Sequence, residues 1–318
     1  MAERRPRLVI SSGDPAGVGP EVTIKALARP EVRELADCVV TGDPDLLRRL
    51  AGNLKLPPPE SIEPAGDAAG VEPGVLSGAG GRAAFEAIRA AVAVISAGHA
   101  EALVTAPINK EALKLAGLPW PGHTEMLAEL AGVTEVRMLL VTENLRVVHV
   151  TTHRSLRSAI EAATRERVLQ TIRITHEGGI RLGYKRPRIA VAGVNPHAGE
   201  GGLFGDEEIR EIRPAVEAAL SEGIDVLGPV PADTLFWRAA GGEFDFVVAM
   251  YHDQGHIPVK LAGFDEGVNL SLGLPFLRTS VDHGTAFDIA GRGIARADSM
   301  VAAIRLAAAV LDRDREPR

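Results

Sequence analysis

Short apolar runs rich in β-branched residues alternate with amphipathic helical patterns along the whole chain. The run Arg7–Ser11 leads into a helix that we expect to begin near Pro20, since Pro is favoured in a first helical turn. Apolar runs at 102–107 and 188–194 each end in a turn before another helical pattern. Strands and helices in this order predict an α/β protein with a largely parallel sheet.

Three regions refine this expectation. The runs 137–141 and 145–151 are separated by Thr142-Glu143-Asn144, which predicts a hairpin and therefore a mixed sheet. Residues 53–81 are rich in Pro, Gly and Ala with little periodicity, so we expect irregular surface structure there. The pattern from Ser155 to Gly178 predicts one long amphipathic helix.

Length and composition limit the class of protein. At 318 residues the chain exceeds one typical core, so two domains or lobes are expected. A net charge of −7 gives no overall attraction to nucleic acid or acidic lipid, and local cations must therefore hold any anionic substrate. The start of the chain has too few consecutive apolar residues for a signal peptide or a membrane span, so a cytoplasmic protein is expected.

The single cysteine, Cys38, excludes an intramolecular disulfide and a cysteine-based metal cluster. It lies in an apolar run, which favours an inert buried thiol.

Three histidines follow predicted strands directly: His153, His197 and His252. Because the carboxyl ends of parallel strands meet at one edge of a sheet, we expect the three imidazoles to converge there. Such a set suits Zn²⁺, Co²⁺, Ni²⁺ or a similar ion, which can act as a Lewis acid. The alternative is that each is a hydrogen-bonded turn residue, which is favoured for any one of them alone.

Cationic and polar residues near glycines provide candidates for binding an anion. Lys260 and Arg278 lie among apolar residues, whereas Arg292 fits a solvated surface charge equally well. His123 and Thr124 stand at a predicted helix start, where Thr124 is a candidate cap and backbone amides favour a phosphate.

Asn269 alternates with apolar residues on a strand, so its amide points to the opposite face from them. The stretch Gly13–Glu21 lacks the G-x-G-x-x-G dinucleotide fingerprint, and Asp43 is only a weak candidate for its acidic partner. The sequence therefore identifies no cofactor-binding residues, and the roles of His283 and Arg292 stay open.

The motifs GDPAGVGPE, TAPINK, GHTE, VTTH, NPHAGEGGLFG, MYHDQG and GVNLSLGLPFLRTS together resemble the 4-hydroxythreonine-4-phosphate dehydrogenase family from about Leu8 to Ala308. The resemblance implies an isocitrate/isopropylmalate dehydrogenase-like fold, with two α/β/α lobes around a cleft, in a homodimer whose active site lies at the subunit interface. We expect the lobes at 1–134 plus 285–318 and at 135–284, the second carrying most of the metal and substrate residues.

The resemblance also implies the reaction: NAD- or NADP-dependent oxidation of a secondary alcohol in 4-phosphohydroxy-L-threonine, then decarboxylation of the β-keto acid, as in pyridoxal phosphate biosynthesis. It implies one divalent ion (Zn, Mg or Co) on His153, His197 and His252, one of them supplied across the dimer interface. It matches His123, Thr124, Lys260, Asn269 and Arg278 to substrate contacts.

The base that takes the hydroxyl proton stays open among Lys260, Asp233 and Asp253. One departure concerns the substrate: His256 extends the HDQG motif, a form associated with paralogues that oxidise 4-phospho-D-threonate or 4-phospho-D-erythronate in sugar-acid catabolism. A non-redox metal-dependent aldolase or phosphatase, and a binding protein that senses a phosphorylated metabolite, are the alternatives from other classes.

Overall fold

The computed structural model describes residues 5–263 and 267–315, which divide into two units, Met1–Val136 with Leu274–Arg318 and Arg137–Gly273. The chain passes from the first unit to the second between residues 136 and 137, where the expected boundary was 134/135. The chain returns to the first unit between residues 273 and 274 rather than at the expected 284/285, because the strand that follows Gly273 pairs within the first unit.

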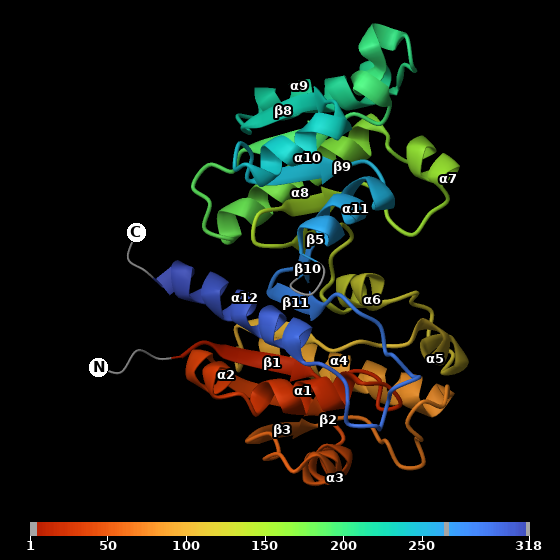
Figure 1. The fold of residues 1–318 in the computed structure, drawn as a ribbon, viewed down its shortest axis with the longest axis vertical. Helices are drawn as coiled ribbons and strands as arrows, with labels where there is room; N and C mark the ends of the chain where they lie inside the picture. Colours follow the sequence, from red (N-terminus) through yellow and green to blue (C-terminus); the bar gives the residue numbers. More distant parts are fainter. Residues whose placement is uncertain (1–4, 264–266, 316–318) are drawn as a thin grey trace. The chain divides into compact units, whose positions relative to one another are not determined.

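The first unit contains a five-stranded parallel sheet in the order β3-β2-β1-β4-β11 (Figure 1). Its strands are β1 (Arg7–Ser11), β2 (Asp37–Gly42), β3 (Ser61–Pro64), β4 (Ala102–Thr105) and β11 (Leu277–Val281). Its helices are α1 (Gly19–Leu27), α2 (Pro30–Leu35), α3 (Pro44–Leu54), α4 (Gly78–Ser96), α5 (Lys110–Leu115), α6 (His123–Leu130) and α12 (Asp298–Arg315).

Different helices cover the two faces of this sheet, and successive residues of a strand point to opposite faces. Val9 and Leu103 pack with Ile88 of α4 and with α5 and α6 in one buried cluster. On the other face, the Thr279 hydroxyl donates to the backbone of Ala303 in α12. The residues on either side of Thr279 therefore point toward the α4, α5 and α6 face.

The second unit contains a mixed sheet in the order β10-β5-β6-β9-β7-β8 (Figure 1). Its strands are β5 (Arg137–Val141), β6 (Arg146–His149), β7 (Ile189–Ala192), β8 (Val226–Val230), β9 (Phe246–Ala249) and β10 (Val268–Leu272). Its helices are α7 (Leu156–Glu161), α8 (Arg165–Arg181), α9 (Arg213–Ser221), α10 (Ala232–Ala240) and α11 (His252–Ala262), with a 3₁₀-type segment at Pro196–Gly202 and a π turn at Glu208–Ile212.

The predicted hairpin is confirmed, since β5 and β6 pair antiparallel, and β10 adds a second antiparallel pair. Side chains of α10 and α11 share a buried cluster with β5, β6, β7 and β9. On the other face of the sheet, two glycines of α8 allow close approach, because a Cβ on Gly179 would lie 2.9 Å from the ring of Phe246.

Three local expectations were wrong. Residues 53–81 include the edge strand β3, whose residues are mostly exposed and so give little apolar signal. The helix predicted from Ser155 to Gly178 is two helices, because Thr164 turns to extended backbone and its hydroxyl caps α8. The cap of α6 is Gly122 rather than Thr124, and no side chain caps that helix.

No helix in the described ranges is long and apolar enough to cross a membrane.

Close packing of α4 on α5 depends on a glycine. A Cβ atom on Gly81 would lie 2.1 Å from the backbone oxygen of Ala112. We expect Gly81→Ala to lower the free energy of unfolding by about 1–3 kcal/mol, because backbone must move to relieve the clash. Gly52→Ala in α3 is the control, because no atom outside its chain neighbours and the adjacent backbone of its own helix lies within 4 Å of its Cβ position. That variant should gain up to about 1 kcal/mol from helix propensity. Urea unfolding of both variants measures this, and equal stabilisation would contradict the packing argument.

Candidate functional site

The parallel pairing of β6 with β9 brings two of the three predicted metal ligands together. Val147 pairs with Val247 and His149 with Ala249, so both strands end at the same edge. His153 follows β6 and His252 follows β9, and their ring centroids lie 5.7 Å apart. Both rings line a cavity of about 330 Å³, to which Asp253 and Tyr251 also contribute.

The two histidines differ in their local structure. His153 has a left-handed backbone, φ 38°, which is uncommon for a residue other than glycine. His252 is the first residue of α11, and its Nδ1 lies 2.7 Å from Oδ1 of Asp253. A carboxylate on Nδ1 fixes the ring and directs Nε2 away from it, as is usual behind metal-binding histidines.

His197 does not join this pair. It lies beyond β7 in the segment Pro196–Gly202, has φ 53°, and its Nδ1 lies 3.0 Å from Oε2 of Glu200. The buried Glu208 anchors the start of the segment by accepting hydrogen bonds from the backbone N–H groups of Val194 and Asn195, both at 2.7 Å.

Within residues 5–263 and 267–315, no three or more His, Cys, Asp or Glu side chains are grouped to hold a metal ion. The spacing of His153 and His252 nevertheless fits a divalent ion, because two imidazoles bound at Zn–N distances of about 2.0–2.1 Å have ring centres about 5–6 Å apart. A single chain thus offers two suitable nitrogen ligands. The three-histidine set stays a prediction.

A buried histidine pair supports His252 from behind. His149 of β6 is buried, and its Nε2 lies 3.1 Å from Nδ1 of His256, whose ring stacks on His252 at 3.5 Å between centroids. A Cβ on Gly255 would lie 2.3 Å from that Nε2, so glycine is required there. Burial, and then the neighbouring His256 and His252, lower the pKa of His149 to about 3, which keeps the ring neutral.

The candidate bases of the second unit lie in different places. Asp253 is 71% exposed and engaged by His252, Asp233 is exposed in the first turn of α10, and Lys260 is half-buried further along α11. Asn269 occupies β10, and its buried Oδ1 has no hydrogen-bond partner. The structure groups Asp253 with the histidine pair and does not distinguish the other two as bases.

The first unit holds the remaining predicted substrate contacts. Arg278 of β11 is 3% exposed, and burial lowers the pKa of its guanidinium to about 9. His123 starts α6, with Thr124 beside it, and its buried Nε2 has no hydrogen-bond partner. Burial, and then the charges of Arg278 and Lys110, lower the pKa of His123 well below its usual range. A neutral imidazole and two cations therefore lie near one another at an uncapped helix start, an arrangement suited to an anion.

Sequence reasoning missed Thr105, the last residue of β4. Its hydroxyl accepts hydrogen bonds from Nε and Nη2 of Arg278, at 3.1 and 2.6 Å. The signal was present, since a polar residue ends the buried run Ala102–Thr105 as the histidines end theirs.

The glycine-rich turn after β1 serves packing. A Cβ on Gly13 would lie 2.4 Å from the backbone oxygen of Pro107. Asp14 is buried, which raises its pKa, and its Oδ1 accepts from the N–H of Ala16. Asp43, the weak ribose candidate, instead caps α3 by accepting from the N–H groups of Asp45 and Leu46. The described contacts of this turn assign no cofactor-binding residue.

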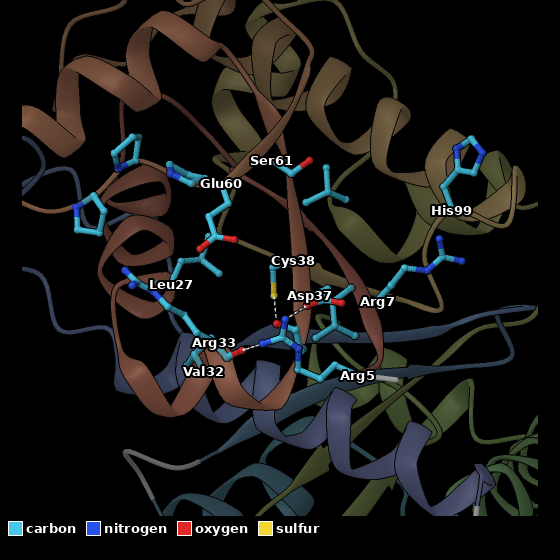
Figure 2. A pocket seen from close by; sticks show the side chains of 16 residues that line it. Arg5, Arg7, Leu27, Val32, Arg33, Asp37, Cys38, Glu60, Ser61 and His99 are labelled. Carbon is cyan, nitrogen blue, oxygen red and sulfur yellow. Dashed lines mark hydrogen bonds and ion pairs between the residues drawn. The ribbon is translucent and has the colours of Figure 1, made fainter. Parts of the chain in front are cut away.

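A larger cavity of about 470 Å³ lies at the start of β1 and β2 in the first unit (Figure 2). Arg5, Arg7 and Arg33 line it with Cys38, and none of the predicted site residues does. Burial, and then the charge of Asp37, raise the pKa of the Cys38 thiol to about 12, consistent with an unreactive thiol.

The chain is thus a two-unit α/β protein, with histidines around a small cavity at the strand ends of one unit and a buried guanidinium beside a helix start in the other. Residues 34–307 match the family model described as pyridoxal phosphate biosynthetic protein PdxA, and the chain belongs to that family.

Curated relatives support the assignment over nearly the full length. The chain is 50% identical to a 4-hydroxythreonine-4-phosphate dehydrogenase of Geobacter metallireducens, over 97% of this chain and 96% of the relative. It is 47% identical to a D-threonate 4-phosphate dehydrogenase of Pectobacterium atrosepticum, over 94% and 98%.

Solved structures confirm the predicted fold class. The structure of a 4-hydroxythreonine-4-phosphate dehydrogenase from Klebsiella pneumoniae superposes with a TM-score of 0.88 at 48% identity, covering 96% of this chain and 99% of that one. A β-decarboxylating dehydrogenase from Thermococcus kodakarensis shares the fold, with a TM-score of 0.50 at 17% identity over 97% of this chain and 83% of that one. The protein is therefore an oxidoreductase with the isocitrate/isopropylmalate dehydrogenase-like fold.

Proposed function

We propose that the protein catalyses the NAD- or NADP-linked oxidation of a secondary alcohol in a four-carbon phosphorylated acid, with decarboxylation of the resulting β-keto acid. The observation that carries this proposal is the 47–50% identity, over nearly the whole chain, to dehydrogenases named for such acids. A buried guanidinium beside a neutral histidine supports an anionic substrate.

The residues of the chain are assigned by their chemistry. Arg278, His123 and the first turn of α6 bind an anionic group of the substrate, because they offer charge and N–H donors in a water-poor setting. His153 and His252 are two ligands for a divalent ion, with Asp253 fixing the second ring. Lys260 and Asn269 are substrate contacts, and Lys260 or Asp233 takes the hydroxyl proton. When bound, the ion supplies a Lewis acid for oxygen and the nicotinamide accepts a hydride.

The third metal ligand is assigned to His197 of a second copy of the chain. His197 is 62% exposed on its own chain and does not approach the His153–His252 pair closely enough to complete a metal site. A homodimer that presents this side chain to its neighbour would complete a three-histidine set.

Two substrates of the proposed class differ only at the carbon next to the carboxylate, which carries an amino group in 4-phosphohydroxy-L-threonine and a hydroxyl in 4-phospho-D-threonate. The first is favoured by the relative of 50% identity and the second by the relative of 47% identity together with His256.

A coupled assay of these two acids and 4-phospho-D-erythronate, followed at 340 nm with NAD⁺ and NADP⁺, tests the function. We expect reduction of the nucleotide with at least one acid, release of CO₂, and loss of both in excess EDTA. Turnover that persists in the chelator would exclude the metal, and metal-dependent cleavage without any change at 340 nm would favour an aldolase or phosphatase.

The cross-chain ligand has its own test. We expect His197→Ala to lose bound metal and turnover while its circular dichroism and melting temperature stay close to wild type, because the side chain is exposed. His99→Ala, at another exposed histidine, is the control and should keep its metal. Metal content is measured by elemental analysis after loading with Zn²⁺ and desalting. A normal metal content in His197→Ala would remove this residue from the ligand set.

Arg278 is tested by its effect on one substrate only. We expect Arg278→Ala to raise KM for the phosphorylated acid by about 10- to 150-fold with little change for the nucleotide, because a charge-assisted contact contributes about 1.5–3 kcal/mol. Arg292→Ala is the control, since that side chain is exposed. Steady-state kinetics with each substrate varied separately decides, and equal increases in both KM values would mean that Arg278 has a structural role.

A further inference from the structure

A hydroxyl network surrounds the guanidinium of Arg278 inside the first unit. Thr105 is fully buried and Ser280 is 4% exposed, and both lie on the same face of the sheet as Arg278. The β4–β11 register sets Ser280 opposite Thr105 and Arg278 opposite Leu103, two positions earlier on each strand. The three polar side chains therefore form a group fixed by the sheet itself.

The directions of the hydrogen bonds are mutually consistent. Thr105 donates its hydroxyl proton to Oγ of Ser280 at 3.0 Å, and Ser280 donates to the backbone oxygen of Thr105 at 3.2 Å. Because the proton of Thr105 is directed toward Ser280, the lone pairs of its oxygen are available to Nε and Nη2 of Arg278.

The chemical nature of this acceptor matters for binding. Thr105 holds one edge of the guanidinium with an uncharged oxygen, so this contact orients the group without offsetting its positive charge. A carboxylate in the same place would orient the guanidinium equally well and would weaken its attraction for an anion. Nearby, the buried Nε2 of His123 has no hydrogen-bond partner, which is consistent with a ligand that donates to it, because the one N–H of the neutral ring is directed to the backbone of Ala106.

We propose that Thr105 is a positioning residue for anion binding: it fixes the guanidinium of Arg278 in the orientation that receives the phosphate or carboxylate of the substrate, and Ser280 fixes the hydroxyl of Thr105. The assignment of the anion as substrate rests on the proposed function; the hydroxyl network does not.

Two substitutions separate positioning from general stability. Thr105→Val keeps the shape and removes the acceptor, whereas Thr105→Ser keeps the hydroxyl. Thr41→Val is the matched control, because Thr41 is equally buried and its hydroxyl donates to the backbone of Ala87 at 2.7 Å. Ser11 of β1 lies between the two threonines in the sheet, since it pairs with Thr41 of β2 on one side and with Thr105 of β4 on the other. Both valine variants lose one buried hydroxyl in the same sheet, and only one of them touches Arg278.

We expect Thr105→Val to raise KM for the phosphorylated acid about tenfold, the factor that corresponds to 1.4 kcal/mol, with a smaller change in kcat and in KM for the nucleotide. Thr105→Ser should restore KM to within about threefold of wild type, a difference of roughly 0.6 kcal/mol. Thr41→Val should lower the melting temperature without changing KM. An unchanged KM in Thr105→Val, an equal loss in Thr105→Ser, or the same KM change in Thr41→Val would overturn the proposal.

Binding of inorganic phosphate, measured without turnover, keeps this inference separate from the function. Phosphate should raise the melting temperature of the wild type and of Thr41→Val, and should raise that of Thr105→Val and Arg278→Ala much less. If the wild type oxidises none of the three acids but shows this pattern, the proposed substrates fail and the positioning role stands. No phosphate effect on the wild type, or an equal effect on Thr105→Val, would overturn the positioning role.

Discussion

The parallel pairing of β4 with β11 is the contact on which the position of Arg278 in the first unit depends. Its register places Arg278 and Ser280 on the face that carries α4, α5 and α6, and places Thr279 against α12. A slip of one residue would exchange these faces and bury the guanidinium among the apolar side chains of α12. The same pairing explains why the chain returns to the first unit at Leu274.

The second unit applies the same rule with a different result. The β6–β9 pairing brings His153 and His252 to a common edge, and the glycine before His256 lets α11 approach closely enough for the ring of His256 to meet His149. His252, His256 and His149 follow one another from the cavity inward, and burial keeps the innermost ring, that of His149, neutral. Strand pairing thus positions His252, and packing behind it limits the rotation of its ring.

The sequence predicted the features that depend on residues close together in the chain, and it did not predict those that depend on residues far apart in the chain. The strand ends were predictable because apolar runs and the residues after them are local, and His153 and His252 do meet. His197 follows its strand in the same way, but the left-handed segment anchored by Glu208 carries it elsewhere, and this depends on a glutamate beyond the segment. A polar strand end marks Thr105 in the sequence, but its contact with Arg278 depends on the β4–β11 register, which no local pattern contains.

Four of the positions matched to the family site carry a local cost in free energy. His153 and His197 adopt left-handed backbone, and His123 and Asn269 each keep a buried polar atom without a hydrogen-bond partner. Each such feature costs about 1–3 kcal/mol, in proteins whose total stability is about 5–15 kcal/mol. Packing alone gives no reason to retain them, because a glycine would relieve each backbone and an apolar side chain would remove each unpaired atom. A ligand bound at His123, or one that donates to Asn269, would offset the cost of that atom, and this is a physical argument for a binding function at each of these positions.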